Sequence, residues 1–194
     1  MTKFVDAKFL VQSNYAEKLQ EHGMVLANKE TILDKYFDTR ELKLLQAGMF
    51  LRDRNNSLEL KVLDHWHGNY QDYKGVTEFH ISTNEQIEEI LKMRLNANLS
   101  DMTTLCTIEF EREYWSCINY KVVIDAVKLG KTESVHKIGE IKLENTDNKP
   151  LDAFKEEVSS YLRELDFEQI EDGKLAVKLK DENYPAYLKL KSMM

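Results

Sequence analysis

Two short runs of alternating apolar and charged residues, MFLRDR and SLELKV, stand close together with the pair Asn55-Asn56 between them. Side chains alternate between the two faces of a strand, so Arg52 and Arg54 share one face, and Glu59 and Lys61 share a face of the second strand. Asparagine tolerates the positive φ angles of a tight turn. The sequence therefore predicts a β-hairpin with one apolar face and one charged, largely cationic face.

The charged face of this hairpin has two interpretations. Arginine opposite glutamate is an ordinary cross-strand pair on an exposed sheet, and such a pair contributes about 0.2–1 kcal/mol. Alternatively, the cations form one wall of a binding site for an anion. The hairpin alone does not distinguish a surface ion pair from an anion-binding site, so the other segments of the chain have to be considered.

The overall charge of the protein narrows the class of ligand. The 194 residues carry a formal net charge of -7, and the isoelectric point is about 5.4. Nucleic acids and anionic membranes require a basic surface, so we expect neither as a partner. Cations grouped within an acidic protein instead favour a small anionic ligand. The length suits one domain, residues 1–194, and we expect a monomer rather than an oligomer.

The N-terminal residues and the cysteines indicate the compartment. The segment MTKFVDAKFLVQ lacks the apolar centre of a signal peptide, and no apolar run approaches the roughly 20 residues that span a bilayer. The chain has two cysteines, Cys106 and Cys117. We therefore expect a cytoplasmic protein with reduced thiols, and a disulfide between the two is the less favoured alternative.

Strand and helix patterns occupy separate runs of the chain, which is typical of an α+β domain with an antiparallel sheet. We expect about eight strands and three or four helices. Strand patterns lie at residues 3–11, 25–39, 49–54, 57–62, 73–81, 105–117, 120–130 and 134–145. Helix patterns lie at residues 15–23, 83–95 and 151–167, with a helical turn after Thr39, and residues 173–179 and 184–191 are expected as short helical or irregular elements.

Two arrangements of this sheet fit the pattern. Many strands carry charges opposite their apolar residues, and closing such a sheet gives an eight-stranded antiparallel barrel with a polar interior and helices outside. An open sheet with one solvated face is the alternative, and periodicity does not separate the two. In a closed barrel the cations Lys8, Arg52, Arg54, Lys61, Arg112 and Lys174 would converge with the acids Asp6, Glu59, Glu78, Asp125, Glu140 and Glu144.

Such a collection of side chains suits a bound triphosphate. Arginine offers a fixed fork of donors for phosphate oxygens, and lysine adds a point charge. Carboxylates beside phosphate are compatible when a hard cation such as Mg²⁺ or Mn²⁺ lies between them. A metal can activate water, so this kind of hydrolysis needs no Ser, Cys or His nucleophile.

Several segments, in this order, resemble a known family. YFDTRELKLLQAGMFLRDRNNSLELK, then FEREYW, VVIDAVKLG, GEIKLE and GKLAVKL are similar to the CYTH superfamily of triphosphate tunnel metalloenzymes, and most to its animal thiamine-triphosphatase branch. The resemblance covers most of the chain. It implies an eight-stranded barrel, or tunnel, and metal-dependent hydrolysis of thiamine triphosphate, with inorganic tripolyphosphate or a nucleoside triphosphate as the next candidates.

The resemblance also implies a role for individual residues. The phosphate-binding cations are Lys8, Arg52, Arg54, Lys61, Arg112 and Lys174, and we expect Lys8, Arg52, Arg54 and Lys61 to act in catalysis. The ligands of Mg²⁺ or Mn²⁺ are expected to be Asp6, Glu78, Asp125, Glu140 and Glu144. Glu59 and Glu78 have an alternative role, because either can pair with an arginine or lysine of the site.

The acidic half of the sequence departs from the family pattern. Phe4 stands at the first acidic position of the motif E-x-E-x-K, Asp6 replaces its second glutamate, and Lys142 stands where relatives often keep a glutamate. Fewer carboxylates weaken metal binding. A second hypothesis is therefore a polyphosphate- or nucleotide-binding module with weakened catalysis, and an adenylate-cyclase-like activity on ATP is a more remote third.

Overall fold

The computed structural model describes residues 3–63, 78–118, 120–129, 135–145 and 151–192. Side chains are described within these ranges except at residues 3–6, 63, 78–80, 142–145, 151, 152 and 154. The described chain forms two compact units. Unit 1 contains residues 3–31 and 110–174, and unit 2 contains residues 32–63, 78–109 and 175–192.

The described strands follow one order, β5-β4-β3-β2-β6-β7-β8-β1-β9, and every pairing with a described register is antiparallel. This confirms an α+β fold with an antiparallel sheet. The order runs from β5 to β9 without closing, so the predicted barrel is not confirmed. The strands are β1 (Lys3–Leu10), β2 (Val25–Asp38), β3 (Met49–Arg54), β4 (Ser57–Leu63), β5 (Glu78–Ile81), β6 (Thr103–Ser116), β7 (Lys121–Lys128), β8 (Val135–Asn145) and the two-residue β9 (Gln169–Ile170).

Six α-helices lie in the described ranges, more than the three or four expected. They are α1 (Tyr15–Glu21), α2 (Lys43–Gln46), α3 (Asn84–Leu95), α4 (Leu151–Glu164), α5 (Lys174–Glu182) and α6 (Tyr184–Lys191), with a short 3₁₀ helix at Leu99–Asp101. The excess arises because the two C-terminal segments are complete helices. Asn183 caps α6 by accepting a hydrogen bond from the backbone of Ala186. None of these helices combines the length and apolar character that crossing a bilayer takes.

Unit 1 has its apolar core on one face of β1, β6, β7 and β8. Phe9 of β1 is fully buried, stacks on Phe167 with ring centroids 4.6 Å apart, and pairs with Gly139 of β8. A Cβ atom at position 139 would lie 2.1 Å from the Phe9 ring, so glycine is required there. Lys8 of β1, Arg112 of β6 and Asp125 of β7 lie on the opposite face of these strands.

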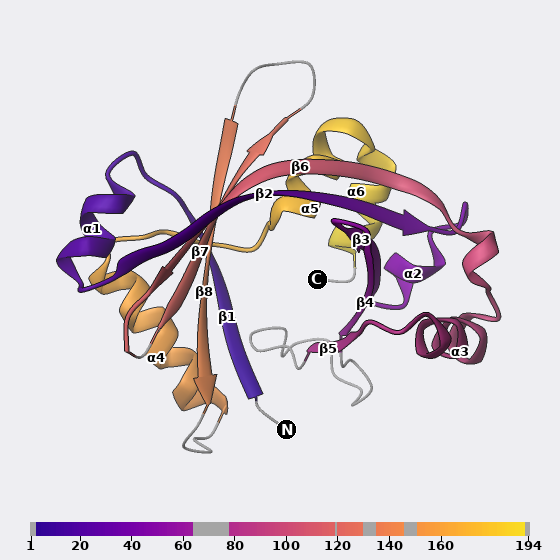
Figure 1. The fold of residues 1–194 in the computed structure, drawn as a ribbon, viewed down its shortest axis with the longest axis horizontal. Helices are drawn as coiled ribbons and strands as arrows, with labels where there is room; N and C mark the ends of the chain where they lie inside the picture. Colours follow the sequence, from indigo (N-terminus) through magenta and orange to yellow (C-terminus); the bar gives the residue numbers. More distant parts are fainter. Residues whose placement is uncertain (1–2, 64–77, 119, 130–134, 146–150, 193–194) are drawn as a thin grey trace. The chain divides into compact units, whose positions relative to one another are not determined.

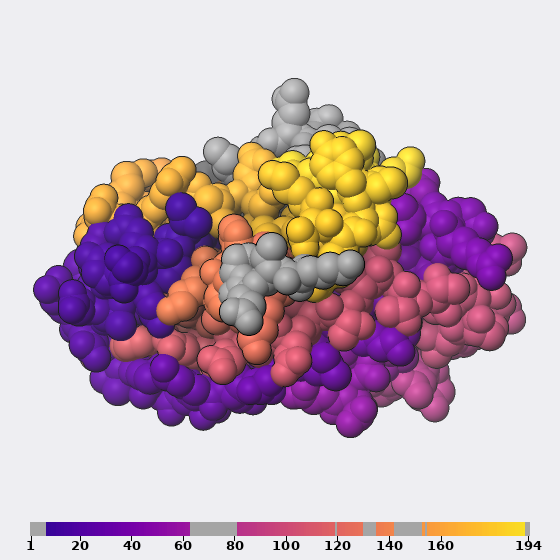
Figure 2. Space-filling view, turned by 90° about the horizontal axis from the view of Figure 1, so that it is seen from above, coloured from indigo at the N-terminus to yellow at the C-terminus, as the bar shows by residue number. Residues whose placement is uncertain are grey.

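Helices α1 and α4 cover the core of unit 1, and they lie side by side in Figures 1 and 2, α1 in indigo and α4 in orange. Leu19 of α1 and Leu162 of α4 are buried in the same core. Lys18 forms an ion pair of 2.9 Å with Asp166, just after α4. The two free thiols, Cys106 and Cys117, form no disulfide.

Unit 2 packs the apolar face of the hairpin against α2 and α3. Leu51 of β3 and Leu60 of β4 pair directly and are buried together with Leu91 of α3. Asn55 and Asn56 have φ angles of 48° and 68°, which confirms the predicted turn. In the space-filling view, α5 and α6 form one exposed yellow surface of unit 2 (Figure 2).

Asp38 of the YFDT segment holds the backbone in place between the end of β2 and the start of α2. The Asp38 carboxylate is 1% exposed and accepts hydrogen bonds from the backbone nitrogens of Thr39, Leu44 and Leu45 at 2.7, 2.9 and 3.0 Å. Burial raises the pKa of Asp38, and these three hydrogen bonds oppose that shift. Asp38 therefore acts as a structural cap that leads the chain into the hairpin.

Candidate functional site

A cluster of charged side chains lies on the unit 2 face opposite the apolar core. The register pairs Asp34 with Arg54, Tyr36 with Arg52, and Arg52 with Glu59. Residues that pair directly lie on the same face of a sheet, so all five share one face of β2, β3 and β4. We call these five residues the unit 2 cluster, and they confirm the charged face that the hairpin predicted.

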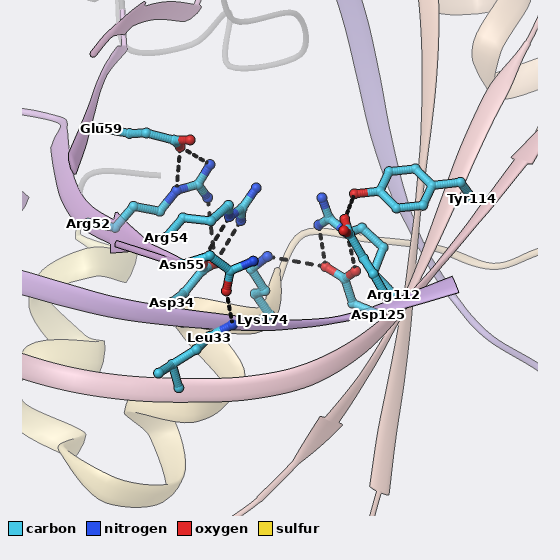
Figure 3. A network of polar contacts seen from close by, with 11 residues as sticks. Leu33, Asp34, Arg52, Arg54, Asn55, Glu59, Arg112, Tyr114, Asp125 and Lys174 are labelled. Atoms are coloured by element: carbon cyan, nitrogen blue, oxygen red, sulfur yellow. Dashed lines mark hydrogen bonds and ion pairs between the residues drawn. The ribbon is translucent and has the colours of Figure 1, made fainter. Parts of the chain in front are cut away.

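Asp34 is the buried centre of the unit 2 cluster. Its carboxylate has no exposed surface and accepts two hydrogen bonds from Arg54, from Nε and Nη2, both at 2.7 Å (Figure 3). Nη1 of Arg52 lies 3.7 Å from Asp34 Oδ2. A bidentate pair of this kind fixes the plane of the guanidinium as well as its position.

Arg52 is held by a second carboxylate and lies opposite a tyrosine. Its Nε and Nη2 donate to Glu59 Oε2 at 2.9 and 2.6 Å, and Tyr36 is its register partner in β2. Burial acts to lower the pKa of Arg52, but Tyr36, Asp34 and Glu59 outweigh it and the pKa is raised. Burial raises the pKa of Tyr36 to about 12, against the opposing effect of Arg52. Both groups therefore keep their protons, and Arg52 keeps its charge.

Lys61 extends the same face along β4. It stands two positions after Glu59, and its register partner in β3 is Phe50. Its side chain is half-buried. Unit 2 thus brings together three of the predicted phosphate-binding cations, Arg52, Arg54 and Lys61.

Unit 1 repeats the arrangement with different residues. Arg112 of β6 donates from Nε and Nη2 to the two oxygens of Asp125 in β7, both at 2.6 Å (Figure 3). Lys174 Nζ donates to the same carboxylate at 3.2 Å. Burial acts to lower the pKa of Arg112, but Asp125 and, more weakly, Glu140 outweigh it, so the pKa is raised. One buried carboxylate thus orders two cations.

Aromatic rings flank the cations of unit 1. The Lys174 ammonium lies 3.8 Å from the centroid of the Phe110 ring, and the Arg112 guanidinium lies 5.4 Å from the same centroid. Tyr114 lies 5.8 Å from the Arg112 guanidinium and donates a hydrogen bond from its hydroxyl to Glu30. Cations held over rings in this way are attracted by the ring quadrupole, which adds to their fixed orientation.

The Lys8 side chain lies close to Gly173, which has no side chain of its own to obstruct it. It pairs with Glu140 across β1 and β8, and a Cβ atom at Gly173 would lie 2.9 Å from Lys8 Cε and 3.2 Å from Cδ. The Lys8 stem therefore passes directly over the glycine that precedes Lys174. Among the described side chains, none forms a hydrogen bond or ion pair with the Lys8 ammonium.

The predicted metal ligands are described only in part. Asp125 is bound at both oxygens by Arg112, which does not suit it as a metal ligand, and Glu140 lies opposite Lys8 in the register. The side chains of Asp6, Glu78 and Glu144 lie outside the described residues. In the part of the chain that is described, no three His, Cys, Asp or Glu side chains gather as a metal site. The metal ligands therefore stay predictions.

Asp34 and Tyr36 are the residues of this arrangement that the sequence analysis missed. Ile32, Asp34, Tyr36 and Asp38 stand at alternate positions of the predicted strand and therefore share one face. In the structure all four are buried, and the residues between them are more exposed. Acidic residues at the buried positions of a strand need cationic or backbone partners, because an unpaired buried charge is strongly unfavourable. Position 34 could therefore have been paired with the arginines of the hairpin.

Comparison with protein families identifies the chain. The model of the CYTH domain matches residues 5–173, which is most of the sequence. The chain belongs to the CYTH domain family. The matched range contains five of the six predicted phosphate-binding cations. The sixth, Lys174, directly follows the last matched residue.

Two curated proteins are similar to part of this chain. The thiamine-triphosphatase of Macaca fascicularis is 43% identical over 80 residues, which are 38% of this chain and 33% of the relative. The human thiamine-triphosphatase is 45% identical over 53 residues, 27% of this chain and 23% of the relative. The matched parts thus span a third or less of these proteins, and they confirm the resemblance to the thiamine-triphosphatase branch.

Solved structures support the fold over nearly the whole chain. A Pyrococcus horikoshii protein aligns with a TM-score of 0.63 and 19% identity, covering 91% of this chain and 97% of its own. A Hippeastrum protein, described as a putative adenylyl cyclase with a dominant triphosphatase activity, aligns with a TM-score of 0.61 and 15% identity, covering 93% and 96%. At these identities the likeness concerns the fold.

Proposed function

We propose that this CYTH protein hydrolyses a triphosphate-bearing small molecule in a metal-dependent reaction. Thiamine triphosphate is the favoured substrate, because both curated relatives carry that name, followed by inorganic tripolyphosphate or a nucleoside triphosphate. The observation that carries the proposal is the pair of buried carboxylates, Asp34 and Asp125, which each order two cations of a CYTH chain. Oriented guanidinium and ammonium groups are what a chain of phosphates requires.

The proposal includes the closed, eight-stranded tunnel that the family resemblance implies. The substrate-binding cations are then Lys8, Arg52, Arg54, Lys61, Arg112 and Lys174, with Lys8, Arg52, Arg54 and Lys61 acting in catalysis. Their part is to bind the phosphate oxygens and to stabilise the negative charge that develops as the terminal phosphate is transferred to water.

The metal of the proposed reaction is Mg²⁺ or Mn²⁺. The backbone register supports a site on β1 and β8, because Lys8 pairs with Glu140 and Phe4 with Glu144, which places position 6 between them. Asp6, Glu140 and Glu144 would hold the ion, with Glu78 as a further ligand. Asp125 would join them only by releasing Arg112 and Lys174, so we assign it to ordering those cations. When bound, the metal activates water and neutralises phosphate charge.

The remaining parts of the proposal concern partners and location. We propose a monomer in the cytoplasm that binds a small-molecule triphosphate and neither nucleic acid nor membranes. The net charge of -7 supports this, because a polyanionic partner would be repelled over most of the surface.

A second candidate function is a polyphosphate- or nucleotide-binding module with weakened catalysis. It is favoured by Phe4 and Lys142, which replace carboxylates of the family's metal-binding pattern. The cations do not depend on those positions, so phosphate binding would persist when metal-dependent turnover is lost.

One assay tests both functions. Purified protein is given thiamine triphosphate, tripolyphosphate or ATP with Mg²⁺, Mn²⁺ or a chelator, and released phosphate is measured beside a variant carrying both Arg52→Ala and Arg54→Ala. We expect release that requires metal and is lost in the variant. Equal release by both proteins would reject the enzyme. Tight calorimetric binding of tripolyphosphate without release would establish the binding module instead.

A further inference from the structure

Two carboxylates of the unit 2 cluster contact Arg52, but they differ in exposure. The Asp34 side chain has no exposed surface, whereas the Glu59 side chain is 27% exposed. Asp34 contacts both Arg54 and Arg52, and Glu59 contacts Arg52 (Figure 3). The difference in exposure implies that they respond differently when an anion arrives.

Asp34 is not able to leave the arginines. Both of its oxygens accept hydrogen bonds from Arg54, and its departure would leave a buried charge without a partner, which is strongly unfavourable. The Arg54 Nε and Nη2 donors are therefore committed to the protein. Its guanidinium is presented to a ligand in one orientation, through its remaining donors.

Glu59 occupies the edge of Arg52 that an anion would use. The Nε and Nη2 donors of Arg52 both bond to one oxygen, Glu59 Oε2. This edge of a guanidinium is well suited to two oxygens of a phosphate. Glu59 stands on β4 with part of its surface in solvent, so its side chain can rotate away without leaving a buried charge. Arg52 would still have the Asp34 carboxylate 3.7 Å from its Nη1.

We propose that Asp34 is a positioning residue that fixes Arg54 and Arg52, and that Glu59 is an internal competitor that a phosphate group displaces from Arg52. The inference rests on the proposed function, because the ligand is the triphosphate of that function. Glu59 satisfies the charge of Arg52 before the ligand binds, and it lowers the affinity for the ligand by the same contact. Removing the Glu59 charge should therefore tighten anion binding, whereas removing the Asp34 charge should weaken it.

The test is calorimetric titration with inorganic tripolyphosphate in the presence of a chelator. We expect Glu59→Gln to bind about threefold to tenfold more tightly than wild type, the range for breaking a partly exposed charged hydrogen bond. Asp34→Asn should bind about tenfold more weakly or worse, because Arg54 loses its orientation. Asp53→Asn is the matched control, since Asp53 lies between the arginines in β3 but on the other face. It removes the same charge and should change the affinity less than twofold.

A second measurement does not depend on the stability of Asp34→Asn. In wild-type protein, the Nε–H signals of the arginine side chains are followed by ¹⁵N NMR during the same titration. The Arg52 signal should shift as Glu59 is replaced by phosphate, and the Arg54 signal should stay close to its starting position.

The outcomes separate this inference from the proposed function. Absence of any tripolyphosphate binding by the wild type would reject both. Wild-type binding with an unchanged or weaker Glu59→Gln variant would reject the displacement of Glu59. An Arg54 signal that shifts as far as that of Arg52 would reject the positioning role of Asp34.

Discussion

At the scale of single residues, two buried aspartates hold the cations of the candidate site in fixed orientations. Asp34 and Asp125 are almost fully buried, and each accepts a bidentate pair from an arginine. Asp125 was predicted to bind metal, and in the structure its carboxylate accepts hydrogen bonds from Arg112 and Lys174. An acidic residue beside predicted phosphate-binding cations can therefore hold those cations in place.

Lys8 depends on the absence of a side chain at Gly173. In Gly173→Ala the new methyl group would lie 2.9 Å from Lys8 Cε, so the flexible lysine must move. We expect the affinity for tripolyphosphate to fall several-fold and the free energy of unfolding to change by less than about 1 kcal/mol, because a mobile stem adjusts at low cost. Calorimetry and urea unfolding measure the two quantities. Unchanged affinity in a correctly folded variant would show that Lys8 does not need this position.

Glu113 links stability to pH outside the candidate site. It accepts hydrogen bonds from Tyr15 and Trp115 at 2.9 Å and pairs with Lys29 at 2.6 Å. Burial acts to raise the pKa of Glu113, but these donors outweigh it and the pKa is lowered. The unfolded state then binds the proton more readily, so this stabilisation is present above the ordinary glutamate pKa and is lost as pH falls through the lowered value.

We therefore expect Glu113→Gln to lower the free energy of unfolding by about 1–2 kcal/mol at pH 7. The difference from wild type should shrink as the pH is lowered from 5 to 3. Glu111→Gln, at an exposed position on the same strand, is the control and should show neither effect. Urea unfolding at several pH values provides the comparison. A difference that is constant over this range would contradict the assigned link to Glu113 ionisation.

At the scale of elements, the strands and the hairpin could be predicted because alternation and turn chemistry are local. The alternation in MFLRDR and SLELKV predicted which residues of β3 and β4 share a face, and Asn55-Asn56 predicted the turn between them. The helices α5 and α6 could not be predicted as complete helices, because eight or nine residues are too few for periodicity to exclude irregular structure. Asp34 was missed because its partner Arg54 is twenty positions away and is brought near by strand pairing.

The junction between β2 and α2 offers a test at the same scale. Asp38→Ala removes the acceptor of three backbone N–H groups in a buried position, so we expect the free energy of unfolding to fall by about 2–3 kcal/mol. Part of the cap's contribution is already offset by the burial of its charge, which is why we expect no larger loss. Urea unfolding measures it, with the exposed Glu41→Ala as control. An equal effect of both substitutions would contradict the capping role.

At the scale of the whole molecule, the fold class and the family could be predicted because their signal is spread over most of the chain. The CYTH domain match over residues 5–173 and the antiparallel strand order bear this out. Closure of the barrel depends on contacts between strands far apart in the sequence, which alternation does not specify. The metal-binding half depends on Asp6, Glu78 and Glu144, whose side chains lie outside the described residues.

The proposed hydrolysis depends on phosphate-binding cations that include Arg54 and Arg112. The direct measurement is the rate of phosphate release from thiamine triphosphate with Mg²⁺ for wild type, Arg54→Ala from unit 2 and Arg112→Ala from unit 1. Arg163→Ala is the control, because that side chain on α4 is 63% exposed. We predict that each site variant lowers kcat/KM by about a hundredfold or more while the control keeps the wild-type rate. Wild-type rates in either site variant, or no release by the wild type, would contradict the account.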